Sequence, residues 1–152
     1  MTERSTQHAT FVIERRFAAS PAQVFAAWAT PAAKAHWFAG PDEWEKGRRE
    51  LDFRVGGREH LSGGPKGGPV HVFDALYQDI VPGQRIVYSY DMHLDEKRIS
   101  VSLATVEFKP SDAGTRLIFT EQAVFLDGYD DAGSRERGSH GLLDQLAAAL
   151  NR

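Results

Sequence analysis

GSHGLLDQLAAAL, residues 138–150, is the stretch with the clearest helical periodicity in the chain. Its apolar residues recur at three- and four-residue steps and so form one stripe along a helix: Leu142, Leu143, Leu146, Ala147 and Leu150. The other side of the helix is mostly formed by Ser139, Asp144, Gln145 and Ala148. A helix with one apolar stripe buries it against another layer. Because almost everything before this stretch has the pattern of strands, we expect the helix to pack on a sheet.

Two glycines, Gly138 and Gly141, lie in the first turns of this helix. A glycine inside a helix costs up to about 1 kcal/mol relative to alanine. We therefore expect a frayed start near Gly138, preceded by a flexible polar run over residues 133–139. The alternative is a close approach of the glycine backbone to strands or to a ligand.

The composition sets the broad class of the protein. The chain has 152 residues, of which 41% are apolar and 26% charged, and we expect one globular domain over residues 1–152. The net charge of −3 comes from interspersed acidic and basic residues, so we expect no nucleic-acid partner. The absence of cysteine excludes disulfides, thiolate metal sites and cysteine nucleophiles. No apolar run approaches the roughly 18 residues of a membrane span, and the N-terminus does not have the pattern of a signal peptide, so we expect a cytoplasmic protein.

The pattern before the last helix predicts an α+β fold. A two-residue alternation indicates a strand over residues 10–17, and Ser20-Pro21 and Thr30-Pro31 are start signals for short helices over 22–29 and 31–37. Six further strands are predicted over 44–54, 58–61, 70–81, 84–93, 98–108 and 115–124. Consecutive strands with short turns favour an antiparallel sheet of about seven strands. If this sheet curves around the last helix, the space between them is either packed or a ligand cavity.

Several short motifs occur in this order along the chain: Arg16-Phe17, Ala19-Ser20-Pro21, Val24-Phe25, Trp28, Trp37-Phe38, Gly40-Pro41, Asp52-Phe53-Arg54-Val55-Gly56-Gly57, Val81-Pro82-Gly83-Gln84-Arg85-Ile86-Val87-Tyr88 and Gly114-Thr115-Arg116-Leu117. Together with the element order they resemble the helix-grip fold of the START-like (SRPBCC) superfamily, which includes the birch-pollen allergen, polyketide cyclases and lipid-transfer domains. The branch they resemble is named after the C-terminal domain of the activator of the heat-shock-protein-ninety ATPase.

The resemblance implies a single domain with a cavity for an apolar or aromatic molecule. One departure is visible: the branch often has tryptophan after the glycine that begins the last helix, whereas Ser139 follows Gly138 here. This difference widens the expected cavity. A co-chaperone of this branch carries a further N-terminal domain, which we do not expect here. Because a fold does not fix a function, the candidate residues have to be judged individually.

Glu121 is the first candidate for chemistry. It shares one strand face with Leu117 and Phe119 by two-residue alternation, so it points at the helix if they do. A carboxylate in an apolar cavity needs a partner or has a raised pKa. Glu121 is then a general acid or base, or an anchor for a ligand hydroxyl. The alternative is a structural ion pair, for example with Arg54.

Aromatic residues form the rest of the expected site. Tyr88 and Tyr90 share a face and would direct their hydroxyl groups into the cavity, unless they only pack as core. Trp37, Phe38 and Trp44 are expected at its lip, unless they are plain edge packing. The full set of expected ligand-binding residues is Trp37, Phe38, Trp44, Arg54, Tyr88, Tyr90, Phe119, Glu121 and Leu142.

The six histidines show no tight ligand spacing, and we expect neither a metal nor a cofactor. His60 and His71, on neighbouring predicted strands, are the two that we consider for convergence, together with Glu59. His140 begins the last helix near the expected cavity and is a second catalytic candidate. The acidic loop before that helix, LDGYDDAGSRERG over residues 126–138, is interpreted as a structural lid or cap.

Three hypotheses follow, in order of preference. The first is a binding protein for a small hydrophobic or aromatic molecule. The second is an enzyme similar to a polyketide cyclase or hydrolase, with Glu121 in acid–base work together with a tyrosine or His140. The third is a stress-response or chaperone accessory protein that acts through its surface. The sequence leaves open whether any reaction is catalysed and whether the protein is a homodimer.

Overall fold

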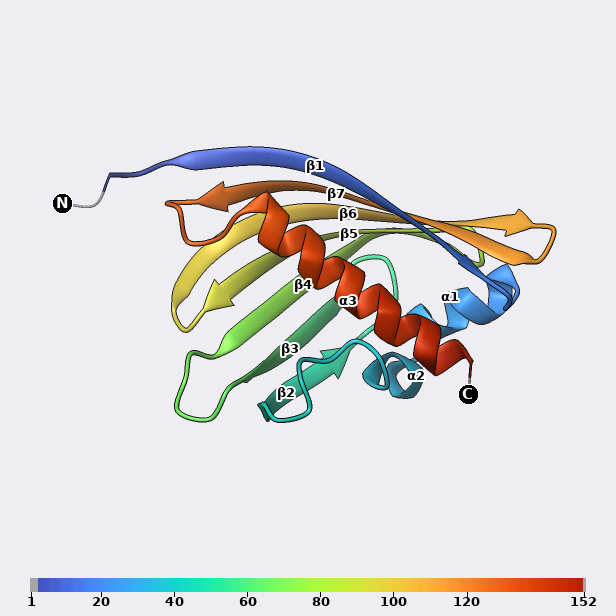
Figure 1. Cartoon of the computed structure of the whole chain (residues 1–152), viewed down its shortest axis with the longest axis horizontal. Coiled ribbons are helices and arrows are strands. Elements are labelled where there is room, and N and C mark those ends of the chain that lie inside the picture. Colours follow the sequence, from blue (N-terminus) through green and yellow to red (C-terminus); the bar gives the residue numbers. More distant parts are fainter. Residues whose placement is uncertain (1–2, 152) are drawn as a thin grey trace.

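The computed structural model describes residues 3–151, and in these residues the chain forms seven strands and three helices (Figure 1). The elements in chain order are β1 (Thr6–Phe17), α1 (Pro21–Ala29), α2 (Pro31–Ala35), β2 (Glu45–Leu51), β3 (Arg58–Gly64), β4 (His71–Val81), β5 (Arg85–Leu94), β6 (Lys97–Ser111), β7 (Gly114–Leu126) and α3 (Ala132–Leu150). The strands form one antiparallel sheet in the order β1-β7-β6-β5-β4-β3-β2. The predicted α+β helix-grip fold is confirmed.

Figure 1 shows the sheet curving around α3, which crosses its concave face diagonally. Leu143 and Leu146 of α3 are buried, as the apolar stripe predicts. Near the C-terminal end of α3, α1 packs against α3, β6 and β7. The start of α1 is fixed by a capping box, in which the Ser20 side chain accepts from the Gln23 N–H and the Gln23 side chain accepts from the Ser20 N–H.

Most predicted strands and short helices differ from the observed ones only at their ends. β1 begins at Thr6, four residues earlier than predicted, because its polar first half pairs with β7 as an edge strand. α2 ends at Ala35, two residues before the predicted end. β3 continues to Gly64 because Gly63 and Gly64 pair with β2, so the predicted loop begins later.

The start of α3 was predicted wrongly. The helix begins at Ala132, six residues before Gly138, and the run predicted to be flexible is helical. The reason is an N-cap: the Asp131 carboxylate accepts a hydrogen bond of 2.8 Å from the Ser134 N–H. The structure contradicts a close approach of strands to Gly138 or Gly141, because a Cβ added at either position would meet no atom outside the helix's own backbone within 4 Å. A close approach of a ligand to Gly138 stays a prediction. Ser139, predicted on the polar side, is buried.

Between residues 3 and 151, no helix is long and apolar enough to cross a membrane.

Candidate functional site

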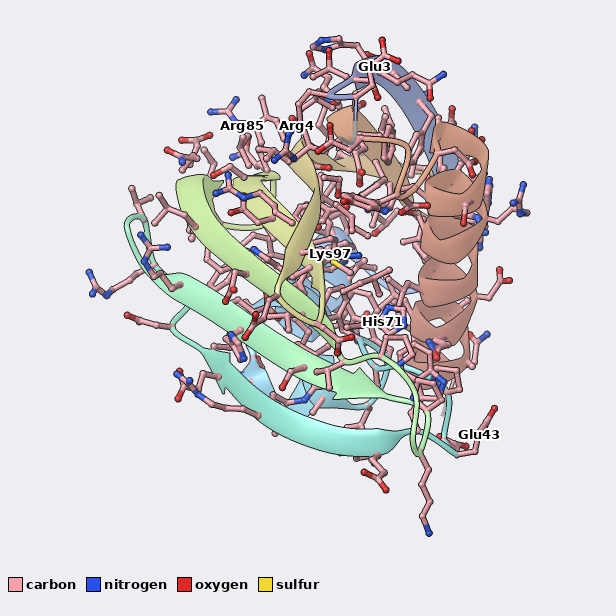
Figure 2. All side chains as sticks on the ribbon, turned by 90° about the vertical axis from the view of Figure 1, so that its left-hand side faces the viewer. Glu3, Arg4, Glu43, His71, Arg85 and Lys97 are labelled. Carbon is pink, nitrogen blue, oxygen red and sulfur yellow. The ribbon has the colours of Figure 1, made fainter. Side chains whose placement is uncertain are left out.

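A cavity of about 640 Å³ lies between the sheet and α3. Its wall is rich in aromatic side chains: Trp28, Trp37, Phe38, Trp44, Phe73, Tyr88, Tyr90, Phe119 and Tyr129. Figure 2 places His71 between the sheet and α3, where it forms part of the wall. The helix contributes Ser134, Arg135, Gly138, Ser139, Leu142 and Leu143. The space between sheet and helix is therefore not filled by side chains.

Eight of the residues proposed from the sequence line this cavity: Trp37, Phe38, Trp44, Tyr88, Tyr90, Phe119, Glu121 and Leu142. They come from the segment after α2, from β5 and β7, and from α3, so the curvature of the sheet brings together residues that are far apart in the sequence. Trp37 also packs as core, because its indole N–H donates to the Ala27 carbonyl at 2.9 Å and its side chain is buried.

Arg54, one of the expected ligand-binding residues, lies outside the cavity, and the alternative of an ion pair between Arg54 and Glu121 is also wrong. The Arg54 Nε donates to the Asp52 carboxylate at 2.9 Å, and the Arg54 side chain is 68% exposed. The physical reason is the turn between β2 and β3, where Gly56 adopts a φ of +83° and the chain reverses at the surface.

His140, the second catalytic candidate, also lies outside the cavity. It lies on the face of α3 that is directed at β1, with its Nδ1 3.0 Å from a guanidinium nitrogen of Arg15. Arg15 also donates to Asp144, one helical turn further along α3, at 2.8 Å. His140 and Asp144 thus connect α3 to the edge strand β1 through Arg15. The cavity is lined by the neighbouring face of α3.

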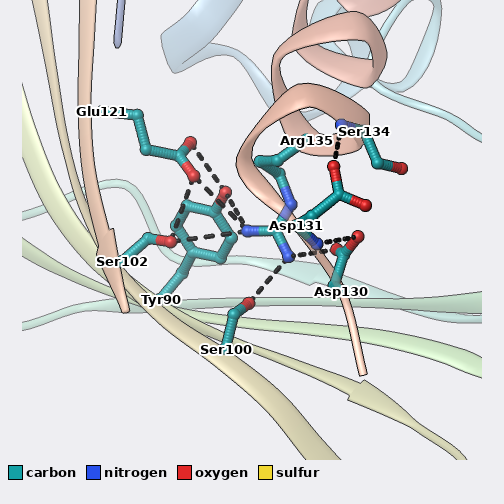
Figure 3. Close-up of polar contacts among 8 residues, drawn as sticks. All are labelled: Tyr90, Ser100, Ser102, Glu121, Asp130, Asp131, Ser134 and Arg135. Atoms are coloured by element: carbon teal, nitrogen blue, oxygen red, sulfur yellow. Dashed lines mark hydrogen bonds and ion pairs between the residues drawn. The ribbon is translucent and has the colours of Figure 1, made fainter. Parts of the chain in front are cut away.

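Glu121 lies where the strand alternation places it. Leu117, Phe119 and Glu121 are all buried on the concave side of β7. The Tyr90 hydroxyl donates to Glu121 Oε1 at 2.8 Å, and the Ser102 hydroxyl donates to Oε2 at 3.1 Å (Figure 3). These hydrogen bonds join β5, β6 and β7 at one end of the cavity.

Arg135 of α3 is the partner of Glu121 that sequence reasoning missed. Its Nη1 lies 3.4 Å from Glu121 Oε2 and donates to the Tyr90 hydroxyl at 3.1 Å. Its Nη2 donates to the Ser100 hydroxyl at 2.7 Å and to the Asp130 carboxylate at 3.1 Å (Figure 3). The sequence does hold the signal, because Arg135 precedes Leu142 of the apolar stripe by seven residues, which is two helical turns. This signal was missed because residues 133–139 were expected to be flexible.

Burial raises the pKa of Glu121, and the Arg135 charge together with the hydrogen bonds from Tyr90 and Ser102 opposes that shift. Burial also raises the pKa of Tyr90, and the neighbouring Glu121 carboxylate adds to the effect. Tyr90 therefore stays protonated and donates a hydrogen bond to Glu121. The Glu121 residue is 0% exposed, whereas Tyr90 is 7% exposed and the Arg135 side chain 11%. All three side chains line the cavity, and the Glu121 carboxylate there already has Tyr90 and Arg135 as partners.

A second buried ion pair, also missed from the sequence, lies behind the wall. Lys34 of α2 is 1% exposed and its Nζ lies 2.6 Å from Glu59 Oε1 of β3, which also accepts from the Tyr77 hydroxyl at 2.7 Å. The Lys34 Nζ also lies 4.4 Å from the centre of the Phe38 ring. Burial lowers the pKa of Lys34, and Glu59 opposes this shift. Neither Lys34 nor Glu59 lines the cavity.

Glu59 and the two histidines considered for convergence point to different partners. Glu59 faces Lys34, and the His60 Nδ1 lies 2.6 Å from the Asp74 carboxylate. His71 stacks on Trp44 with ring centres 4.5 Å apart, and burial lowers the pKa of His71. The convergence considered from the sequence is therefore not found. The Trp44–His71 stack forms part of the cavity wall.

One family model and several solved structures match the chain. The family model described as "Activator of Hsp90 ATPase homolog 1-like protein" matches residues 18–151. An uncharacterized protein from Rhizobium leguminosarum has a structure with a TM-score of 0.95 and 50% identity, covering 99% of both chains. The Mll3558 protein from Rhizobium loti follows with a TM-score of 0.89 and 48% identity, covering 95% of this chain and 99% of that one.

Protein CV1439 from Chromobacterium violaceum is more distant, with a TM-score of 0.79 and 26% identity over 94% of this chain and 97% of that one. No curated protein matches the chain.

Proposed function

The chain belongs to the family of Activator of Hsp90 ATPase homolog 1-like proteins, and we propose that it binds a small hydrophobic or aromatic molecule in the cavity between the sheet and α3. The observation that carries this proposal is the aromatic-lined cavity of about 640 Å³ with a cluster of polar groups at one end. Binding sites for small molecules have volumes of about 300–1,000 Å³ and combine apolar walls with a few placed polar groups.

The polar end offers both a donor and an acceptor to such a molecule. The Tyr90 hydroxyl donates its hydrogen bond to Glu121, so toward a ligand its oxygen acts as an acceptor. The Arg135 guanidinium supplies donors and is held in place by Ser100 and Asp130. A bound molecule with a hydroxyl group at this end would replace the hydrogen bonds that it loses in water.

Binding without catalysis fits this site better than acid–base chemistry. A general base has to reach the proton that it removes, directly or through one intermediary. Glu121 lines the cavity but is 0% exposed, and its oxygens accept hydrogen bonds from the Tyr90 and Ser102 hydroxyl groups, while His140 lies on another face of α3. A catalytic cycle would therefore have to displace one of these hydroxyl groups from Glu121 or pass its proton through it.

Glu121→Gln separates the two possibilities, because glutamine keeps the size of the side chain and removes the carboxylate. A binding protein keeps most of its affinity for a neutral ligand when this charge is removed. An acid–base enzyme loses turnover with the same substitution.

The direct test of binding is native mass spectrometry of the protein purified from its own host. We expect a second mass series for the chain with one small molecule bound, which solvent extraction then releases for identification. The neutral fluorophore N-phenyl-1-naphthylamine is the second probe, and we expect saturable binding of one molecule per chain. A single unliganded mass together with no saturable fluorophore binding would refute the proposal.

The cytoplasmic location, the possible homodimer and the chaperone-accessory alternative stay predictions. Fractionation of the host tests the first, and light scattering after size exclusion tests the second. A protein partner that is captured in equal amounts from wild type and from cavity variants would favour the third.

A further inference from the structure

Arg49 of β2, an edge strand of the sheet, lies in the cavity wall. It pairs with Leu61 of β3, another residue of the wall. Its Nη2 donates to the Phe38 carbonyl at 2.6 Å, which holds the guanidinium against the segment that follows α2. The arginine is thus anchored by a backbone oxygen while the rest of its guanidinium remains available.

Arg49 has no acidic partner among residues 3–151, where no carboxylate oxygen lies within 4.0 Å of its guanidinium. Glu59 attracts it but already forms its short contact with Lys34. Partial burial lowers the pKa of Arg49, which shows that its charge is incompletely solvated where it lies. Arg49 is exposed as a whole residue but lines the cavity. An arginine in a cavity wall without a carboxylate partner pairs with an anionic group of a molecule in that cavity.

The preceding residue provides a natural contrast. Arg48 points to the outer surface and donates to both carboxylate oxygens of Glu50, at 2.9 and 2.8 Å. Two adjacent arginines of one strand therefore differ in pairing: the outer one is neutralised and the inner one is not. The part of the wall formed by β2 also contains Lys46 and Glu45. The single negative charge of Glu45 balances only one of the two positive charges, those of Lys46 and Arg49.

The far end of the cavity has the opposite character. Arg135 faces two carboxylates there, Glu121 at 3.4 Å and Asp130 at 3.1 Å. An anionic group of a ligand at that end would meet two carboxylates and only one cation, Arg135. The charges of the wall therefore direct an anionic group toward Arg49 and a neutral hydroxyl group toward Tyr90.

We propose that the ligand is an amphipathic anion, with a hydrophobic or aromatic body over the aromatic wall and a carboxylate or sulfonate group paired with Arg49. This inference rests on the proposed function and adds the charge and the orientation of the ligand. Arginine is suited to this role because its planar fork pairs with two oxygens of one acid group.

The experiment compares two fluorophores that share one body. N-phenyl-1-naphthylamine is neutral, and 1-anilinonaphthalene-8-sulfonate adds a sulfonate to the same rings. Each is titrated into wild type, Arg49→Gln and Arg48→Gln, and the two must displace each other so that only cavity binding is counted. The variants remove one positive charge each, from adjacent residues.

We expect Arg49→Gln to lower the preference for the sulfonate over the neutral probe by about three- to tenfold, as for a partly exposed charge-assisted pair. Arg48→Gln should leave the preference unchanged, and Arg49→Lys should keep part of it because the charge remains. Higher ionic strength should weaken sulfonate binding in wild type more than in Arg49→Gln.

Equal preferences in wild type and Arg49→Gln would overturn this inference, and so would equal losses in Arg48→Gln and Arg49→Gln. In both cases, saturable binding of the neutral probe would leave the proposed function standing. No saturable binding of either probe to wild type would instead refute the proposed function and this inference with it.

Discussion

Two buried ion pairs join helices to the sheet, and they differ in what they face. Lys34 and Glu59 link α2 to β3 through one short contact of 2.6 Å, closed off behind the aromatic wall. Arg135 and Glu121 link α3 to β7 across 3.4 Å, with hydroxyl groups of Tyr90, Ser102 and Ser100 around them at the cavity. The first pair is satisfied without access to the cavity. The second holds groups that a bound molecule can reach.

The contrast shows that buried charge alone does not mark a binding site. Both pairs have partners, as buried charges require. What distinguishes the Arg135 pair is that the side chains around it line a cavity. We therefore expect changes at Lys34 to alter stability alone, and changes around Arg135 to alter both stability and binding.

Lys34→Met should have the largest effect on stability. It leaves the Glu59 carboxylate buried with only the Tyr77 hydroxyl as partner, which should lower the free energy of unfolding by about 3–5 kcal/mol. Urea denaturation measures this loss. The double variant Lys34→Met/Glu59→Gln is the control and should recover part of it, because neither charge remains. A loss below about 1 kcal/mol would mean that the pair contributes little.

Arg135→Met should have the next largest effect on stability. It removes charge-assisted hydrogen bonds to Asp130 and Glu121, and we expect a loss of about 2 kcal/mol in the free energy of unfolding. It should also weaken binding of a probe that carries a hydroxyl group. Arg137→Met is the matched control, since Arg137 is exposed two residues away, and should stay within about 0.5 kcal/mol of wild type. Equal losses in the two variants would contradict the assigned role of Arg135.

Glu121→Gln should change how stability depends on pH. The folded-state pKa of Glu121 is raised above 4.5, so between the two pKa values the folded state binds more protons than the unfolded state. Wild-type stability relative to the variant should therefore be highest below pH 4.5 and fall as pH rises through the folded pKa, by about 1.4 kcal/mol per pH unit within that window. Urea denaturation at stepped pH checks this. A difference that rises with pH would show that Arg135 outweighs burial.

The fold was largely predictable because the strand pattern is strong and local. Strand β7 alternates apolar residues with a period of two, and the same pattern placed Glu121 on the concave face. The ends of elements depend on tertiary pairing, which is why β3 extends through two glycines. At α3, the glycines of the early turns hid a helix start that Asp131 stabilises.

The site was only partly predictable from the sequence. The contacts of each side chain depend on which face of a helix is turned toward the sheet and on where a loop leads the chain. His140 was expected near the cavity, but with Asp144 it faces Arg15. Arg54 was expected in the cavity, but the turn at Gly56 keeps it at the surface. Lys34 was not singled out, because a lysine on a short helix is normally exposed. Only the folded chain shows that it lies under four aromatic rings: Trp28, Phe38, Tyr77 and Tyr88.

Filling the cavity tests the central claim most directly. Ser139 is a small residue in the wall, and Ser139→Trp would place an indole in the space that a ligand needs. Ala148→Trp adds the same ring to the exposed side of α3 and is the control. Titration with N-phenyl-1-naphthylamine should show one site per chain in wild type and in Ala148→Trp, and at least about a tenfold loss of affinity in Ser139→Trp. Undiminished binding by a folded Ser139→Trp variant would contradict the account, because the probe would then bind outside the cavity.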